Sequence, residues 1–520
     1  WIGADSQKLE QAWKFDVYER TITEHTCRLE AAESDAGKLS AAEAQKVHLT
    51  GKIPAEELIP LLYGHVEQNS STLGAAGIRV PGSAGETTHA LEQPNGIRSL
   101  NMADGPAGIR LHQSYEVDAD SGKVYGKSVL GALENGYLEP MQKHENAKTY
   151  YQFCTAFPVG TAMAQTWNEE LLQSFGRAVS HEMKEFHIDL WLAPGMNIQR
   201  NPLCGRNFEY YSEDPFLSGK MAAAVVRGVQ EEGTCGAVIK HFACNNQEDN
   251  RMGSDSILSE RTLREIYLKG FEIAVKQGGA YSIMSTYGPV NGLWTAGSYD
   301  LLTTILRKEW GYQGIVMTDW WASVNDVVKG GKQDHHALSS MVRSQNDLYM
   351  VVNNNGAEIN AMGDDILEAL DNGKLTIGEL QRSAKNICRF ILNAPVMKRP
   401  LRPLEEVKAY EPLQGAGSEG ANGESDISIV PEDKVSQKIY VNQSGVYNVV
   451  VKFISPQSNL AQAAANLYLN DELFFTLQTS GTEGRPNTQK ICRVELKQGY
   501  YEIKTEVVKP KLEMEWIQLW

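Results

Sequence analysis

The chain has 520 residues, of which 42% are hydrophobic and 22% charged, the balance of a soluble globular protein too long for one ordinary core. Its formal net charge of −16 argues against a nucleic acid or an anionic membrane as partner, because both attract basic surfaces, and fits a neutral or cationic small substrate better. The seven cysteines are odd in number and form no CxxC pair, and no apolar run approaches the length of a membrane span. We therefore expect reduced thiols in a cytoplasmic, reducing compartment rather than disulfides or a zinc site.

Residues 1–72 are polar and helix-prone, and we expect them to form a helical flanking region that carries no chemistry. Ser40, followed three residues later by Glu43, makes a capping box at the start of one such helix. The chain begins at Trp1, with neither a methionine nor a signal peptide. The expectation is that an upstream segment has been removed or lies on another polypeptide.

Residues 73–400 repeat one pattern, in which a short apolar segment ends in polar residues and is usually followed by an amphipathic helix. About seven or eight such repeats predict an α/β fold, a (β/α)8 TIM-type barrel. An open doubly wound sheet has the same alternation, but no GxGxxG turn follows the first strand. The expected strands are residues 99–103, 153–159, 188–194, 237–239, 281–285, 315–317 and 347–352, and the clearest helices are 168–186, 259–276 and 301–310.

The apolar run 314–318 has the length and β-branched content of a strand buried on both faces. It ends in a carboxylate, Asp319, which is followed by Trp320 and Trp321. A carboxylate at the carboxyl end of a barrel strand is typical of a catalytic residue. The alternative for Asp319 is a cap on the next helix.

The predicted strand ends gather cations, carboxylates and aromatic rings, a mixture that suits a neutral polyhydroxylated ligand. Charged groups make strong hydrogen bonds to hydroxyls, and rings pack on apolar C–H faces. Nearby cations would also keep Asp319 ionised, as a nucleophile requires. The polar residues at these ends are Asp104, Arg110, Arg206, Glu209, Lys240, His241, Arg251, Tyr287 and Asp319.

Three other chemistries fit this set less well. A metal held by His241 and Asp104 is disfavoured because the eleven histidines show no HxH or HExxH spacing, and no cofactor is expected. Cys244 has no histidine in a recognisable dyad with it, so a small buried residue is a better interpretation than a nucleophile. A Schiff base on Lys240, as in a barrel aldolase or hydratase, is disfavoured because the basic neighbours of Lys240 suit hydroxyl binding better.

After residue 400 the pattern changes. Residues 401–425 end in a stretch rich in Gly, Ser, Ala and Glu, and we expect a linker there. Residues 426–520 alternate apolar and polar residues in short runs, separated by turn residues such as Asn470-Asp471 and Gln498-Gly499. This alternation predicts an antiparallel β-sandwich of the jelly-roll type.

Four motifs, in order and in spacing, resemble those of glycoside hydrolase family 3: NMADGPAGIR (101–110), CGRNFEYYSEDP (204–215), VIKHFACNNQEDNR (238–251) and IVMTDWW (315–321). The resemblance extends over residues 75–395. It implies a retaining β-glycosidase in which Asp319 is the nucleophile that forms the glycosyl-enzyme and Trp320 lies beside the scissile bond. The residues that it implies for the subsite of the non-reducing sugar are Asp104, Arg110, Arg206, Lys240, His241, Arg251, Met284 and Tyr287.

The resemblance also implies where the proton donor lies. The segment 243–246 (ACNN) is similar to the β-glucosidase and β-xylosidase branch, whose acid/base is a glutamate on an α/β-sandwich domain, and lacks the His/Asp loop of the N-acetylglucosaminidase branch. Residues 78–88 and 343–352 resemble the members in which that domain precedes the barrel. The acid/base glutamate is therefore expected outside this chain, on a second chain or an upstream domain.

We expect the chain to remove a non-reducing terminal β-linked glucose or xylose. The alternative is a sugar-binding subunit that is catalytic only with its partner chain. Residues 426–520 resemble carbohydrate-binding modules of the jelly-roll type, and a purely structural appendage is an equal alternative. The preferred sugar, the aglycone and the formation of a homo-oligomer are left open.

Overall fold

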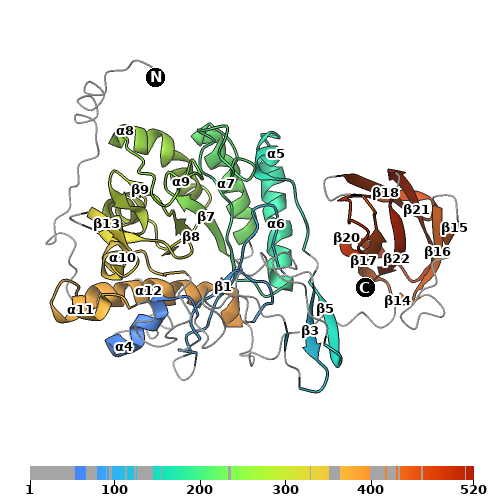
Figure 1. Ribbon diagram of the computed structural model, residues 1–520, viewed down its shortest axis with the longest axis horizontal. Helices are drawn as coiled ribbons and strands as arrows, with labels where there is room; N and C mark the ends of the chain where they lie inside the picture. The colour runs from blue at the N-terminus through green and yellow to red at the C-terminus, as the bar shows by residue number, and fades with distance from the viewer. Residues whose placement is uncertain are drawn as a thin grey trace, which may run out of the picture. The chain divides into compact units, whose positions relative to one another are not determined.

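The computed structural model forms two compact units, which are described separately (Figure 1). The first comprises Trp1–Thr149 and Ala156–Val407, and the second comprises Tyr150–Thr155 and Lys408–Trp520. The structure describes residues 53–65, 79–89, 91–92, 96–111, 114–121, 124–125, 144–152, 154–231, 236–327, 330–350, 363–398, 416–417, 429–430, 434–457, 461–509 and 511–519. Most of the region predicted as helical, 1–72, lies outside these residues.

A curled mixed sheet lies at the centre of the first unit. Strands β2, β6, β7, β8 and β11 are parallel, whereas β1 pairs antiparallel with β2. The five parallel strands are buried along their whole length, which explains why they read as continuous apolar runs. In order across the sheet the strands are β1 (Gly85–Glu86), β2 (Asn101–Ala103), β6 (Leu190–Trp191), β7 (Gly236–Phe242), β8 (Ser282–Ser285) and β11 (Ile315–Met317).

Isolated bridges continue the curl beyond β11. Met317 bridges Leu348 in parallel, Tyr349 bridges Tyr63 in parallel, and the next residue, Gly64, bridges Thr87 in antiparallel fashion. The backbone amide of Gly64 donates to the carbonyl of Tyr349 at 2.9 Å. These contacts lead from β11 back to the segment that contains β1.

Three sequence predictions in this region need correction. The sheet is not uniformly parallel, because β1 opposes its neighbour. The expected strand 153–159 is absent from its described part, 154–159, where a loop leads into helix α5. The expected strand 347–352 takes part only through the bridges at 348 and 349, and residues 351–352 lie outside the described residues.

Helices cover the outer face of the sheet (Figure 1). Helices α6 (Glu169–Glu185) and α7 (Pro215–Gln230) lie side by side, and α7 and α9 (Lys269–Lys276) pack on β7. The Asn168 side chain caps α6 by accepting from the Leu171 amide at 3.1 Å. The expected helix 259–276 begins as α8 (Glu260–Thr262) and passes through a π-helix, η4 (Leu263–Tyr267), before α9. The expected helix 301–310 is a π-helix, η6 (Asp300–Glu309).

The remaining elements of the first unit are shorter, except α12. They are the helices α4 (Ala55–Leu58), η2 (Ile59–Leu62), α5 (Gly160–Ala164), η5 (Thr295–Gly297), α10 (Leu338–Ser344), α11 (Ile366–Asp371), α12 (Ile377–Asn393) and η7 (Pro395–Lys398), and the strands β3 (Ser114–Asp118), β4 (Val124–Tyr125), β5 (Ala147–Tyr151), β9 (Pro289–Val290), β10 (Leu293–Trp294), β12 (Val324–Asp326) and β13 (Gly330–Asp334). Strand β5 continues two residues into the second unit.

The second unit contains two antiparallel sheets that share one core. Valines of β17, alanines of β18 and Ile503 of β21 meet in a single buried apolar cluster. One sheet runs β14-β16-β21-β18-β19 with β15 paired to β16, and the other runs β20-β17-β22. The strands are β14 (Ala416–Gly417), β15 (Ile429–Val430), β16 (Lys434–Val441), β17 (Gly445–Ile454), β18 (Gln462–Leu469), β19 (Glu472–Ser480), β20 (Asn487–Leu496), β21 (Gly499–Lys509) and β22 (Glu513–Leu519).

No helix in the part of the chain that the structure describes has the length and apolar character needed to cross a bilayer.

Candidate active site

The polar residues of interest lie at the carboxyl ends of the parallel strands. Asp104 directly follows β2, Lys240 and His241 lie near the end of β7, and Tyr287 and Asp319 each come two residues after the last residue of β8 and β11. Because these strands are parallel neighbours, their carboxyl ends share one edge of the sheet. The fold therefore brings together residues that are as much as 215 positions apart (319 − 104).

Asp319 is a buried carboxylate with few direct partners. Its residue is 9% exposed, and its Oδ1 accepts the backbone amide of Trp320 at 2.8 Å. The phenol of Tyr287 also hydrogen-bonds to it. Among the described residues, His241 is the basic side chain that comes within 4.0 Å, with its Nε2 3.7 Å from Oδ2. The alternative that Asp319 caps the next helix is wrong, because no helix begins at residues 320–323.

The electrostatic environment of Asp319 combines burial with nearby cations. Burial raises the pKa of the Asp319 carboxyl above its ordinary value, and Arg206, Lys240 and Arg251 together with the Trp320 amide offset only part of that rise. The expected cations are thus present, but burial outweighs them. Burial raises the pKa of the Tyr287 phenol, and the charge of Asp319 raises it further. This phenol therefore stays protonated.

Asp104 is held between two cations. Its Oδ1 accepts from Lys240 Nζ at 2.8 Å and its Oδ2 accepts from Arg110 Nη2 at 2.7 Å. Burial would raise the pKa of Asp104, but Lys240 and Arg110 outweigh it and hold the pKa well below its ordinary value. The loop between Asp104 and Arg110 turns on Gly105, whose φ is +118° and where a Cβ would lie 2.0 Å from the carbonyl oxygen of Gly108.

His241 is completely enclosed and neutral. Its backbone is held by Asn197, whose side chain accepts from the His241 amide at 2.8 Å and donates to its carbonyl at 2.9 Å. Burial, followed by the charges of Arg206 and Lys240, keeps the pKa of His241 well below its ordinary value. The ring therefore carries one proton at neutral pH, and its nitrogens differ in role.

Two more cations complete the cluster, and each has its own acidic partner. Arg206 donates from Nε to Glu209, which is 4% exposed. Arg251 donates from Nη1 to Glu248 at 2.7 Å, and its guanidinium carbon lies 4.6 Å from the centre of the Tyr287 ring. Both arginines are thus fixed in place by neighbours in the sequence.

Met284 and Trp320 contribute apolar surface at the same edge. Met284 pairs in register with Lys240 on one side and Met317 on the other, and it belongs to the buried core of the unit. The Trp320 indole donates to the Ala84 carbonyl at 3.2 Å, and Trp320 packs against the same core. The ten residues predicted for the nucleophile and the sugar subsite thus lie at or beside this edge, and Glu209, also predicted at a strand end, pairs there with Arg206.

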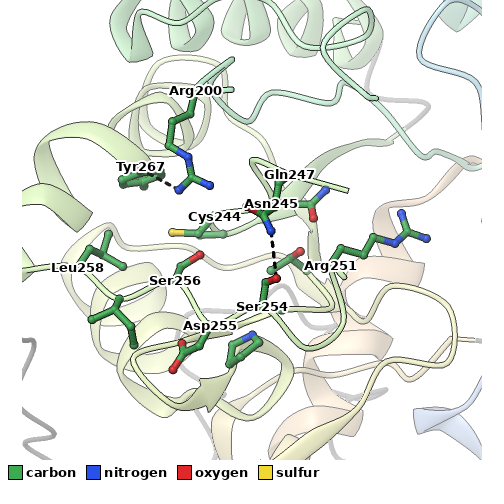
Figure 2. Close-up of a pocket in the computed structure, with 15 residues that line it drawn as sticks. Arg200, Cys244, Asn245, Gln247, Arg251, Ser254, Asp255, Ser256, Leu258 and Tyr267 are labelled. Carbon is green, nitrogen blue, oxygen red and sulfur yellow. Dashed lines mark hydrogen bonds between the residues drawn. The ribbon is translucent and has the colours of Figure 1, made fainter. Parts of the chain in front are cut away.

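A cavity of about 330 Å³ adjoins the cluster and shares Arg251 with it (Figure 2). Within it, Arg200 donates to the Tyr267 hydroxyl at 3.3 Å and Gln247 donates to the Ser254 hydroxyl at 3.0 Å. Cys244 also lines the cavity, and burial raises the pKa of its thiol to about 12, so the thiol is protonated. This agrees with its interpretation as a small buried residue. No group of three or more His, Cys, Asp or Glu side chains in the described ranges is arranged to hold a metal ion.

Sequence reasoning gave no role to three residues that the structure ties to this cluster: Tyr210, Asn245 and Glu248. All three lie within or next to the quoted motifs, where their neighbours drew attention instead. The Asn245 amide donates to both the Tyr210 hydroxyl and Glu248. A polar side chain that is buried would have marked them as candidates. Only the fold reveals that Tyr210 is 0% exposed and Asn245 5% exposed.

The chain is similar to one family model and to several named proteins. Residues 142–390 match the model described as the Glycosyl hydrolase family 3 N terminal domain. A beta-glucosidase of Ruminococcus albus is 44% identical over 345 residues, which are 64% of this chain and 36% of that protein. The solved beta-glucosidase of Paenibacillus barengoltzii is 40% identical, with a TM-score of 0.59 over 97% of this chain and 51% of that one.

A third relative was solved with a sugar. Beta-glucosidase 3B of Thermotoga neapolitana, in complex with alpha-D-glucose, is 39% identical, with a TM-score of 0.54 over 68% of this chain and 43% of that one. The chain thus spans between about a third and half of the length of the relatives named here.

Proposed function

The chain contains a glycoside hydrolase family 3 N-terminal domain, and from that premise we propose that it belongs to a retaining β-glucosidase that removes a non-reducing terminal β-linked glucose. The observation that carries this proposal is Asp319, a buried carboxylate beyond the end of β11 that is surrounded by cations yet directly paired with none of the Lys or Arg side chains in the described ranges. The relatives named beta-glucosidases support the choice of sugar.

In this mechanism Asp319 is the nucleophile. The oxygen that does not accept from the Trp320 amide attacks the anomeric carbon, and a covalent glycosyl-enzyme forms as the bond to the leaving oxygen breaks. The proton that the leaving oxygen needs comes from a carboxylic acid. Water, deprotonated by the resulting carboxylate, then attacks the same carbon and releases Asp319, so the configuration is retained overall.

The proton donor is proposed to be a glutamate outside the described residues, on a partner chain or an upstream α/β-sandwich domain. The two glutamates beside the cluster support this, because both are occupied: Glu209 accepts from Arg206, and Glu248 accepts from Arg251 and Asn245. A retaining enzyme needs its two carboxyls about 5–5.5 Å apart, so the donor has to approach Asp319 closely.

The remaining residues of the cluster are proposed to bind the sugar. Asp104 offers ionised oxygens to two hydroxyls, and the cations that hold it orient those oxygens. Tyr287, Met284 and Trp320 supply aromatic and apolar surface for the C–H faces of the ring. The proposed lining of this subsite is Asp104, Arg110, Arg206, Lys240, His241, Arg251, Met284, Tyr287 and Trp320.

We also propose the domain layout that goes with this function. Residues 73–400 would form the hydrolase domain, a (β/α)8-type barrel, with 1–72 as its flanking region. The bridges at 63–64 and 348–349 support a closed barrel to which the end of the flanking region, Tyr63 and Gly64, also contributes. Residues 401–425 would link it to a sandwich, 426–520, that resembles a carbohydrate-binding module. Strand β14 falls inside this linker and pairs with β16, which supports an earlier start of the sandwich.

The test is covalent trapping. A 2-deoxy-2-fluoro-glucosyl fluoride is expected to add one fluoroglucosyl group to the peptide that contains Asp319, as detected by mass spectrometry of a digest. The Asp319→Asn variant should remain unlabelled. Labelling of any other residue would overturn the proposal.

A second assay separates the enzyme from the sugar-binding alternative. The chain by itself is tested on an activated aryl β-glucoside, whose leaving group needs little protonation, and on cellobiose. Cleavage of the aryl glucoside alone would indicate a working nucleophile whose acid lies elsewhere. Cleavage of neither, with glucose still bound, would favour a binding subunit.

A further inference from the structure

His241 is contacted through both nitrogens of its ring. Nε2 lies 3.7 Å from Asp319 Oδ2, and Nδ1 lies 3.4 Å from the Tyr210 hydroxyl. The Asn197 side chain fixes the His241 backbone from both sides. The two ring nitrogens therefore face different partners, and the position of the single ring proton distinguishes two neutral tautomers.

A chain of three hydrogen bonds links Glu248 to His241 through Asn245 and Tyr210. Its carboxylate only accepts, and it takes one bond from Arg251 Nη1 at 2.7 Å and one from Asn245 Nδ2 at 2.9 Å. An amide oxygen facing that carboxylate would be repelled, so the nitrogen of the Asn245 amide has to point toward Glu248. Glu248 therefore decides which way the Asn245 side chain is turned.

The direction of the next bonds follows from donor and acceptor counting. The same Nδ2 of Asn245 donates to the Tyr210 hydroxyl at 3.0 Å. An amide nitrogen has two protons and cannot accept, so Tyr210 accepts from it and keeps its own proton for another partner. That partner is Nδ1 of His241. Burial raises the pKa of the Tyr210 phenol and lowers that of His241, which keeps the phenol protonated and the imidazole neutral.

We propose that Tyr210, Asn245 and Glu248 are positioning residues that hold His241 in the tautomer with its proton on Nε2. A neutral imidazole that accepts at Nδ1 has its single proton at Nε2, the nitrogen that faces Asp319. In the opposite tautomer the lone pair of Nε2 would face the carboxylate of Asp319, which is unfavourable. At the carboxyl ends of the strands, His241 therefore acts as a hydrogen-bond donor through Nε2.

The consequence for catalysis rests on the proposed function, whereas the tautomer itself does not. When a sugar is bound, the Nε2 proton is available to one of its hydroxyl oxygens. Glu248 holds both Arg251 and Asn245. This one carboxylate therefore fixes the position of the Arg251 guanidinium and, through Asn245 and Tyr210, the tautomer of His241. Glu248 acts through the two side chains that it holds, Arg251 and Asn245, so its role is positioning.

The test is nuclear magnetic resonance of the chain with ¹⁵N-labelled histidine. Long-range ¹H–¹⁵N correlations distinguish the two neutral tautomers, and the His241→Asn variant identifies the signals that belong to His241. The wild type is expected to show the Nε2–H pattern. Tyr210→Phe should add or substitute the Nδ1–H pattern and lower kcat/KM for an aryl β-glucoside by about tenfold, the value of one hydrogen bond.

The matched control is Tyr211→Phe. Tyr211 is the neighbouring buried tyrosine, and no side-chain hydrogen bond links it to the other described residues, so both tautomer and kcat/KM should stay unchanged. If Tyr210→Phe does not fold, Glu248→Gln serves instead, since a neutral amide no longer dictates how Asn245 turns and both tautomers should appear.

An Nδ1–H pattern in the wild type, or an unchanged Nε2–H pattern in Tyr210→Phe and Glu248→Gln, would overturn the proposal. Failure of a fluorosugar to label Asp319 would leave the tautomer result intact, so the two proposals can fail separately.

Discussion

Two groups of buried charges in the first unit differ in how completely they are paired. Beside α10 and α12, Asp347 accepts from Arg307 at 2.6 Å, from Asn386 at 2.8 Å and from the Val316 amide at 2.9 Å. At the strand ends, Asp319 has one backbone amide and one phenol, and its nearest basic nitrogen in the described ranges is 3.7 Å away. Complete pairing fixes a fold, whereas incomplete pairing leaves room for a substrate.

The same contrast holds between a carboxylate that serves only the fold, Glu379, and a carboxylate of the site, Asp104. Glu379, which the Arg343 guanidinium holds at 2.9 Å, also completes the capping box that starts α12, so all its contacts are structural. Asp104 is likewise paired with two cations, but 29% of its side chain remains exposed. A paired carboxylate whose side chain stays partly exposed is suited to hold a ligand, and a nearly unpaired one is suited to react.

The largest effect is expected for Asp319→Asn. Loss of the nucleophile should lower kcat/KM for an aryl β-glucoside by at least roughly a thousandfold. The folded state should not be weakened, because burial already raises the pKa of this carboxyl and the neutral amide relieves that cost. Urea denaturation at neutral pH should give an equal or higher midpoint. Near-normal turnover, or a clear loss of stability, would contradict the assignment of Asp319 as a catalytic rather than a structural carboxylate.

The opposite outcome is expected for Arg343→Met. Removal of this guanidinium leaves the fully buried Glu379 without its cation, which should lower the free energy of unfolding by about 3–5 kcal/mol. At temperatures where the variant is folded, KM should be that of the wild type. Arg261→Met, at a surface pair with Glu265, is the control and should unfold like the wild type.

An intermediate effect is expected for Asp104→Asn. Charge-assisted bonds to Lys240 and Arg110 would be lost together with the proposed bonds to the sugar, so kcat/KM should fall roughly 10- to 100-fold. Asp120→Asn, at an exposed carboxylate bonded to Asn146, is the matched control and should leave kcat/KM unchanged. An effect as large as that of Asp319→Asn would argue that Asp104 takes part in the chemistry.

The smallest effect is a displaced pH profile in Arg206→Gln. Arg206 lowers the pKa of Asp319 against the rise caused by burial, so its removal should raise that pKa further. Asp319 acts in its ionised form, which is lost as pH falls through its pKa, and the acidic limb of kcat/KM should therefore move to higher pH. Arg264→Gln, at a surface cluster with Glu309 and Glu260, should not move it. A limb that stays in place or moves to lower pH would show that another group titrates there.

The central strands and their polar ends were predictable because each carries its own signal. Strand β11 is a continuous apolar run closed by Asp319, and α6 begins at its capping residue, Asn168. Strand β1 has only two residues, Gly85 and Glu86, which is too short for any periodicity, so its antiparallel direction could not be read. The residues behind His241 were missed for another reason: Tyr210 lies in one loop and Asn245 and Glu248 in another, and no local pattern encodes the distances between the two loops.

The turn between Asp104 and Arg110 bears on how this protein can be altered by design. Gly105 cannot accept a side chain, because a Cβ would overlap the Gly108 carbonyl, and Gly108 itself has a φ of +114°. Pro106 and Ala107, between them, are partly exposed. Libraries that aim to retune sugar preference should therefore vary the two middle positions and keep both glycines, since any replacement there would move the aspartate and the arginine together.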